Sequence, residues 1–123
     1  MIQPRSHLTI VDNSGAKYAQ CIRVLKKKNA QVGDLIVVSL KKIKVSQSQK
    51  LKVKKGQVCK ALLLRTKTAL RRKNGSLVLF SENAAVLLNP QKKLIGSRIF
   101  GPSARELRQS KHLKIISMLS YVA

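Results

Sequence analysis

Acidic residues are scarce in this sequence, which has only four of them against 26 lysines and arginines and therefore a formal net charge of +22. A compact domain with so much charge of one sign repels itself, and a polyanion that neutralises it releases counterions and lowers the free energy. The imbalance therefore favours nucleic acid as a partner. Half of the basic residues, 13, lie between Lys41 and Lys73, and no acid occurs between Asp34 and Glu82. This interval is the expected nucleic-acid-facing segment.

Aromatic residues are also few, with two tyrosines, two phenylalanines and no tryptophan. Proteins that stack successive bases need more aromatic side chains than this, so recognition should use phosphates, riboses and folded shape. No window approaches the roughly 20 apolar residues of a membrane span. An apolar run begins almost at the first residue, so we expect neither a targeting peptide nor a membrane partner.

The cysteines and histidines form no pattern that suggests chemistry. Cys21 and Cys59 are far apart in apolar runs and lack a CxxC spacing, which predicts reduced thiols in the core. His7 and His112 have no nucleophile near them in the pattern, and the glycines form neither GxGxxG nor a phosphate-binding loop. We therefore expect a protein that is not an enzyme, with no catalytic residue, metal or cofactor.

Short apolar runs separated by turn signals predict a series of strands. Asp12 and Asp34 lie in segments of turn composition and are interpreted as turn residues, and Glu106 as a helix cap. The segment 41–56 is predicted to be an exposed basic hairpin or loop. The predicted strands cover residues 8–11, 18–25, 35–40, 58–65 and 84–88.

The pair Asn74-Gly75 is the strongest local hairpin signal, because both residues accept the positive φ of a type I′ turn. The predicted strands are Arg72 and Lys73 on one side and residues 76–80 on the other. This hairpin would present basic side chains to a partner.

The periodicity changes after residue 102 and predicts helix. Ser103 and Glu106 fit a capping box, in which Ser103 accepts a bond from a helix amide and Glu106 reaches back, and the helix should end near Ser110. Its spacing would place Arg105 beside Gln109 on a cationic face. Residues 112–119 are a second short helix or a last strand. We expect one domain over residues 1–123, a small closed barrel with a helical appendage at about 103–119.

Several motifs, in order along essentially the whole chain, are those of one known family. They include residues 12–16 (Asp-Asn-Ser-Gly-Ala), 61–64 (Ala-Leu-Leu-Leu), 74–75 (Asn-Gly), 98–102 (Arg-Ile-Phe-Gly-Pro), 105–108 (Arg-Glu-Leu-Arg) and 114–117 (Lys-Ile-Ile-Ser). With these motifs the chain resembles the universal large-subunit ribosomal protein numbered fourteen. The resemblance implies a mainly β fold, a five-stranded small β-barrel with a protruding basic hairpin and one or two short C-terminal helices.

The resemblance also implies a structural constituent of the large ribosomal subunit that binds large-subunit rRNA and bridges to small-subunit rRNA. In bacterial-type ribosomes the family packs against the ribosomal protein numbered nineteen, and a ribosome-silencing factor docks on its exposed end and blocks subunit joining. No homo-oligomer is expected. The sequence departs from the family at residues 26–28, where three lysines replace a glycine pair, and in its last six residues.

Two sets of residues are the candidate contacts. The predicted rRNA-binding set is Lys44, Lys50, Lys52, Lys54, Lys55, Lys67, Arg71, Arg72 and Lys73. The predicted patch for the subunit interface or a silencing factor is Ser97, Arg98, Arg105, Arg108, Lys111, Lys114 and Ser117. Ser97, Arg98, Lys114 and Ser117 are the positions that the family resemblance assigns to the silencing factor.

Composition alone also allows a free-standing basic protein that packages nucleic acid. A cationic membrane-active peptide is disfavoured, because it needs an amphipathic helix with a basic face. Lysine outnumbers arginine by 18 to 8, as expected from an AT-rich gene, and no presequence is visible. We therefore expect a ribosome of the mitochondrial matrix, with the plastid stroma and the bacterial cytoplasm as alternatives.

Overall fold

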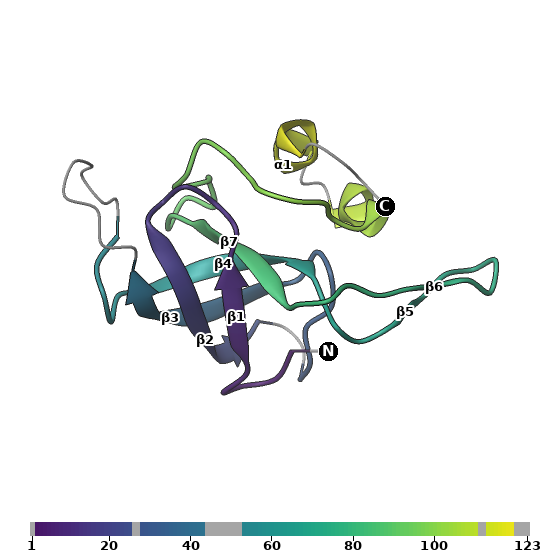
Figure 1. The fold of residues 1–123 in the computed structure, drawn as a ribbon, viewed down its shortest axis with the longest axis horizontal. Coiled ribbons are helices and arrows are strands. Elements are labelled where there is room, and N and C mark those ends of the chain that lie inside the picture. The colour runs from purple at the N-terminus through teal and green to yellow at the C-terminus, as the bar shows by residue number, and fades with distance from the viewer. Residues whose placement is uncertain (1, 26–27, 44–52, 111–112, 120–123) are drawn as a thin grey trace.

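The computed structural model describes residues 2–25, 28–43, 53–110 and 113–119, and these include a closed five-stranded β-barrel (Figure 1). The strands, in order round the barrel, are β1 (His7–Ile10), β2 (Ala16–Val24), β3 (Leu35–Ile43), β4 (Val58–Arg65) and β7 (Ala84–Leu88). Neighbours are antiparallel except β1 and β7, whose parallel pairing closes the barrel. The predicted mainly β barrel is confirmed, and β2 and β3 begin or end a few residues beyond the predicted bounds.

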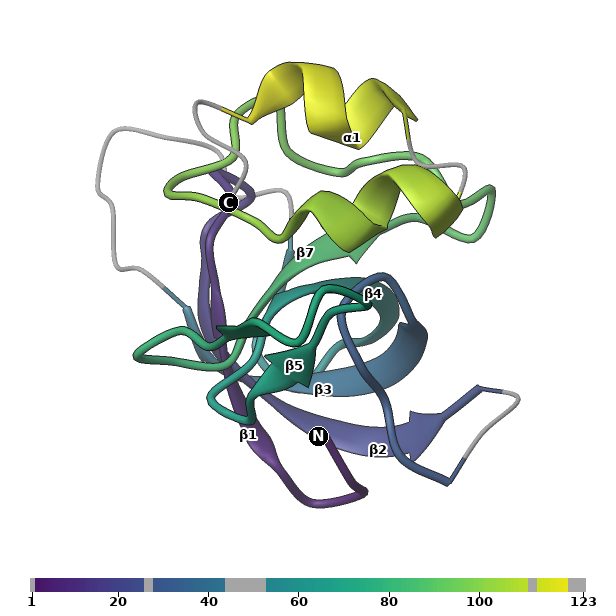
Figure 2. The same cartoon turned by 90° about the vertical axis from the view of Figure 1, so that its right-hand side faces the viewer.

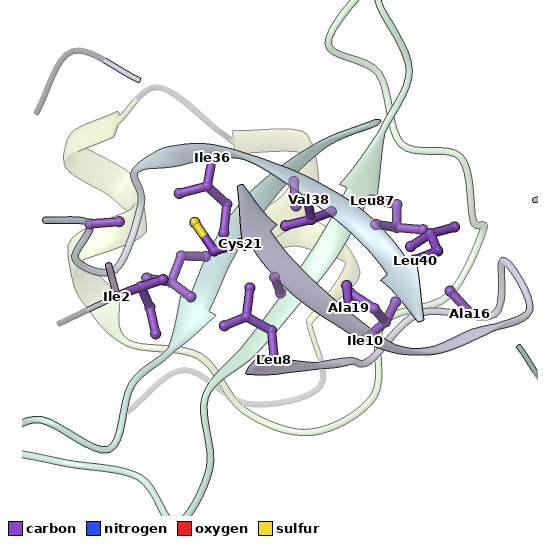
Figure 3. Packing of buried hydrophobic residues seen from close by; sticks show 14 of the residues in the cluster. Ile2, Leu8, Ile10, Ala16, Ala19, Cys21, Ile36, Val38, Leu40 and Leu87 are labelled. Carbon is purple, nitrogen blue, oxygen red and sulfur yellow. The ribbon is translucent and has the colours of Figure 1, made fainter. Parts of the chain in front are cut away.

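Strand β7 and residues 61–65 of β4 are buried on both faces, which explains the continuous apolar run Ala-Leu-Leu-Leu in β4 and the apolar sequence of β7. Leu63 and Leu87 belong to the cluster that fills the barrel, part of which is seen in Figure 3. The alternate residues Leu62 and Val86 belong to a second cluster, which also contains Leu107 of the C-terminal segment. One face of these strands therefore packs inside the barrel, and the other packs under the C-terminal segment.

The parallel seam between β1 and β7 continues past the end of β1 through a side chain. Val11 N donates to Ala85 O at 3.1 Å, and two residues further along β7 Leu87 N donates to Asp12 Oδ2 at 3.1 Å. Asp12 Oδ1 accepts from Ser14 N at 3.2 Å and from Ser14 Oγ at 2.5 Å. Asp12 is thus the turn residue that was predicted, and its buried carboxylate also closes the barrel.

Between β4 and β7 the chain leaves the barrel as a projecting two-stranded hairpin of β5 (Leu70–Arg71) and β6 (Leu77–Val78) (Figure 1). The protruding hairpin is confirmed, but the predicted type I′ turn is wrong, and the predicted strand of Arg72 and Lys73 lies two residues too late, since these residues follow β5. Gly75 has a φ of +88°, whereas Asn74 has no positive φ. Gly75 N donates to Arg72 O and Arg72 N donates to Ser76 O, both at 3.0 Å. This is a three-residue loop, a tight turn followed by a left-handed glycine.

The C-terminal segment forms a 3-10 helix, η1 (Arg105–Ser110), and a short α-helix, α1 (Leu113–Met118), which lie over β7 (Figures 1 and 2). Leu107 of η1 is fully buried and belongs to the same cluster as Val86 of β7. The strand alternative for residues 112–119 is excluded by α1. The predicted α-helical neighbours Arg105 and Gln109 are also wrong, because a 3-10 helix has three residues per turn.

The predicted capping box is wrong. Ser103 is fully buried, and its Oγ donates to Leu64 O of β4 at 3.0 Å. The Glu106 carboxylate lies 2.8 Å from Arg72 Nε. Both side chains therefore make long-range contacts that position the C-terminal segment on the barrel and the hairpin.

Candidate nucleic-acid interface

The hairpin carries exposed cations away from the barrel. Arg71 and Lys73 are exposed on it, and Lys67 is exposed at its root, where the Lys67 amide donates to Asn83 Oδ1 at 2.9 Å. These three predicted rRNA-binding residues therefore lie at one end of the barrel, the end that faces the reader in Figure 2. A rigid projection with cationic side chains can contact phosphates within folded RNA, and such contacts position a protein on its nucleic acid.

Arg72 connects the hairpin to the C-terminal segment. Its Nε lies 2.8 Å from Glu106 Oε1, and its second terminal nitrogen lies 3.4 Å from Oε2. The Arg72 and Glu106 side chains are only 24% and 23% exposed, so water screens this two-point pair less than it screens a surface pair. Arg72 was predicted as an rRNA contact, which stays a prediction, and the structure shows that its side chain pairs with Glu106.

A second ion pair, which the sequence reasoning missed, holds the root of the hairpin. Arg65 ends β4 and lies 2.8 Å from Glu82 Oε1. The Arg65 side chain is 10% exposed, and its Nε has no hydrogen-bond partner among the described residues. Its guanidinium lies so close to Gly101 that a Cβ at residue 101 would collide with it. The available signal was a charge at the end of the most apolar strand, since a buried charge requires a partner.

Lys54 and Lys55 lie at the opposite end of β4 from the hairpin. They precede β4 and the hairpin follows it, so the eight residues of β4 separate the two groups by roughly 25 Å. Both lysines are exposed on a turn in which Lys54 N donates to Gln57 Oε1 at 3.0 Å. The structure therefore does not gather the predicted rRNA-binding residues on one side. Lys44, Lys50 and Lys52 lie outside the described residues.

The second predicted set is also divided. Ser97 and Arg98 are exposed, and the Asn13 side chain holds their backbone, with Oδ1 accepting from Ser97 N at 2.7 Å and from Arg98 N at 3.1 Å. Ser117 is exposed on α1, whereas exposed Arg105 lines a hollow beside the hairpin and so belongs spatially with the first set. Lys111 lies outside the described residues, as do the side chains of Arg108 and Lys114.

The two thiols are poorly suited to act as nucleophiles. Burial raises the pKa of Cys21, and burial together with the nearby charge of Asp12 raises the pKa of Cys59 to about 11. Both free thiols are therefore protonated at neutral pH and are weak nucleophiles.

In the part of the chain that the structure describes, no three His, Cys, Asp or Glu side chains gather as metal ligands. No helix of that part is long and apolar enough to cross a membrane.

A comparison with protein families agrees with this architecture. The family model described as Ribosomal protein L14p/L23e matches residues 1–123, the whole chain. The match confirms the resemblance that the motifs indicated, and it favours a ribosomal component over a free-standing packaging protein. Proteins of this family are structural and non-enzymatic, and rRNA and other ribosomal proteins are their partners. The chain therefore belongs to the ribosomal protein L14p/L23e family and is a structural constituent of the large ribosomal subunit.

Proposed function

We propose that the chain holds large-subunit rRNA chiefly through the end of the barrel that carries the hairpin. The observation that supports this most is the exposure of Arg71 and Lys73 on a projection that the Arg72–Glu106 pair holds in place. A fixed projection loses little conformational freedom on binding, so more of the energy of its phosphate contacts is retained as affinity.

The placement of the acids supports the same proposal. Each of the four carboxylates makes a contact within the protein: Asp12 with Leu87 N, Asp34 with Gln31 N, Glu82 with Arg65 and Glu106 with Arg72. The acids therefore serve the fold, and the large excess of cations on the surface is available to phosphates. Neutralising those cations relieves the repulsion within the chain and releases counterions from the RNA.

The salt dependence of binding to large-subunit rRNA tests this assignment. Each phosphate contact adds roughly 0.7 to 0.9 to the slope of log K against log salt, so Arg71→Ala with Lys73→Ala should lower the slope by roughly 1.4 to 1.8. Lys92→Ala with Lys93→Ala is the matched control, because it removes two exposed cations from a turn outside the hairpin. An unchanged slope in the hairpin variant, or an equal fall in both variants, would contradict the assignment.

We propose that the opposite end of the barrel contributes to the intersubunit interface. Strand β1 runs parallel to β7, so the turn after β1, with Asn13, lies away from the hairpin end. Asn13 holds exposed Ser97 and Arg98 there, where they are available to the phosphates of small-subunit rRNA or to a ribosome-silencing factor. One surface cannot bind both at once, so the two partners should compete.

Sedimentation of ribosomes that carry Arg98→Glu and Lys114→Glu tests this interface. Large-subunit assembly should remain nearly intact, because the hairpin end is unchanged, while subunit association or silencing-factor binding should weaken. Loss of the chain from free large subunits, without a separate joining defect, would show instead that these residues bind large-subunit rRNA.

Exposed apolar side chains on the hairpin are the reason to propose that a protein, as well as RNA, contacts it. Leu77 is 58% exposed and Leu79 is 62% exposed, and large apolar side chains in such positions are typical of surfaces that another protein covers. The neighbour that we propose is the ribosomal protein numbered nineteen in bacterial-type ribosomes. Crosslinking from a cysteine introduced at Leu79 should capture that protein, and crosslinks to rRNA alone would contradict the contact.

The compartment that we propose is the mitochondrial matrix. The support is the excess of lysine over arginine, 18 to 8, which is typical of an AT-rich organellar gene. Sequencing the rRNA that copurifies with the chain tests this directly. Plastid or bacterial rRNA in the purified particle would contradict it.

A further inference from the structure

The outer surface of β2 and β3 combines an aromatic side chain with cations. Tyr18 of β2 is 42% exposed, and Lys17, Lys41 and Lys42 are exposed on the same two strands. The sequences of β2 and β3 contain no acid. None of these residues belongs to the two predicted sets of contacts, so this surface has no role in the function proposed so far.

Irregular pairing between β2 and β3 brings Tyr18 to this surface. In a regular strand neighbouring side chains point to opposite faces, whereas Lys17 and Tyr18 are consecutive and both exposed. The register shifts on each side of Tyr18, between residues 16 and 18 and between residues 18 and 19. The flanking residues Ala16 and Ala19 belong to the cluster that fills the barrel (Figure 3). Bulges of this kind change the direction of side chains and are frequent beside functional sites.

A cation lies over the Tyr18 ring. Lys42 is the cross-strand partner of Tyr18, and its Nζ lies 5.8 Å from the centre of the ring, which is within the range of a cation–π contact. Leu40 O accepts from Gly56 N at 2.8 Å, so the basic turn of residues 54–57 adjoins the same end of β3. Sites for single-stranded nucleic acid combine a cationic surface for the backbone with aromatic rings on which bases stack. The surface around Tyr18 has both features.

We propose that Tyr18 stacks on one unpaired base of an RNA strand, while Lys17, Lys41 and Lys42 contact the phosphates on either side of it. A single ring cannot support successive bases, so the contact is confined to one base. The centre of a protein interface is depleted of charged residues, whereas the ring here has cations beside it, so RNA fits this surface better than a protein does. The inference rests on the proposal that RNA binds at this end of the barrel, and it adds a base contact there.

Tyrosine fluorescence tests the stacking directly. The chain has two tyrosines and no tryptophan, so Tyr121→Phe leaves Tyr18 as the sole tyrosine. The full chain with this substitution is titrated with oligoadenylate of about ten nucleotides and with an abasic oligonucleotide of the same length and charge. Oligoadenylate should quench the emission, because a stacked base contacts the ring. The abasic oligonucleotide should leave most of the emission unchanged.

Affinities measured over a range of salt concentrations separate stacking from charge. Tyr18→Leu should weaken oligoadenylate binding roughly fivefold to 150-fold without changing the salt dependence or the affinity for the abasic oligonucleotide. Tyr18→Phe keeps the ring and should bind as the unsubstituted chain does. Lys42→Gln should lower the slope of log K against log salt by roughly 0.7. Phe100→Leu is the matched control, because it removes another exposed aromatic ring outside β2 and β3 and should not weaken binding.

Equal quenching by the two oligonucleotides, or equal losses in Tyr18→Leu and Phe100→Leu, would overturn the proposal. A photoreactive p-benzoylphenylalanine in place of Tyr18 should crosslink to rRNA in intact ribosomes, and crosslinks to protein alone would also overturn it. The proposed intersubunit interface would survive these results if Arg98→Glu with Lys114→Glu still weakened subunit association. If subunit association were normal in that variant and oligoadenylate still quenched Tyr18, the base contact would stand and the interface assignment would fall.

Discussion

Replacing Asp12 by alanine should destabilise the barrel far more than a typical turn substitution. Asp12 is 2% exposed, and its carboxylate accepts from Leu87 N, Ser14 N and Ser14 Oγ. Leu87 lies on β7 beyond the point at which β1 ends, so the Asp12 side chain provides the acceptor that a longer β1 would provide. Asp12→Ala removes that acceptor where the barrel closes.

The expected loss of folding free energy follows from the donors that lose their acceptor. Two backbone amides, those of Leu87 and Ser14, are left without a partner, and each buried unsatisfied group costs about 1 to 3 kcal/mol, or about 2 to 6 kcal/mol together. The Ser14 hydroxyl can rotate to another acceptor. Removing the buried carboxylate also removes its desolvation penalty, so we expect a loss of about 3 kcal/mol. A domain with about 5 to 15 kcal/mol of stability would remain largely folded.

Urea unfolding followed by circular dichroism measures this loss, at moderate salt so that charge repulsion is similar in all variants. Ser14→Ala is the control, because it removes one donor and leaves the carboxylate, and should cost at most about 1.5 kcal/mol. The Leu87 amide should also exchange with solvent faster in Asp12→Ala. If Asp12→Ala costs no more than Ser14→Ala, the side chain does not close the barrel.

Three further outcomes are expected. A double-mutant cycle on Arg72→Ala and Glu106→Ala should give a coupling energy of about 1 kcal/mol, and additive losses would exclude a stabilising pair. Gly101→Ala should lower the stability by about 1 to 3 kcal/mol, since its φ is +83° and the new Cβ would meet Arg65; an unchanged melting temperature would contradict this. The pKa of Cys59 rises on folding from 9.0 to about 11, so alkylation at pH 8 should be much slower in the folded than in the unfolded chain. Its contribution to stability should be constant below pH 9 and decline as the pH rises towards 11, because only the unfolded thiol ionises there; a Cys59→Ala variant with the same alkaline decline would contradict this.

The strands were predictable because their signal is local. Apolar runs between turn residues located β4 and β7 with the bounds that the structure shows. The partner that covers the second face of each strand was not predictable, because a continuous apolar run does not say what lies on either side. The role of Asp12 was likewise predictable only in part. Its turn with Ser14 is local and was predicted, but its bond to Leu87 joins residues that are 75 positions apart.

Predictions of local structure at the candidate interface were confirmed where neighbours in sequence remain neighbours in space. The hairpin was found from Asn74 and Gly75, although the turn type was wrong because Asn74 accepts from Ser76 N and Oγ instead of adopting a positive φ. Ser103 and Glu106 matched a capping box by spacing, yet burial of Ser103 and the proximity of Arg72 gave both side chains other partners. A spacing motif cannot show that a competing long-range partner is nearby.

The division of the cations between the two ends of the barrel follows from topology. Because β4 runs from the segment with Lys54 and Lys55 to the root of the hairpin, basic residues that are continuous in sequence are separated by the whole length of a strand. Parallel pairing of β1 with β7 then places the Asn13 turn, with Ser97 and Arg98, at the same end as Lys54. A compact body with separate cationic ends can bind two RNA surfaces at once, whereas a single basic face could bind only one. The arrangement therefore agrees with the proposal that the chain holds large-subunit rRNA at the hairpin end and contacts a second partner at the other end.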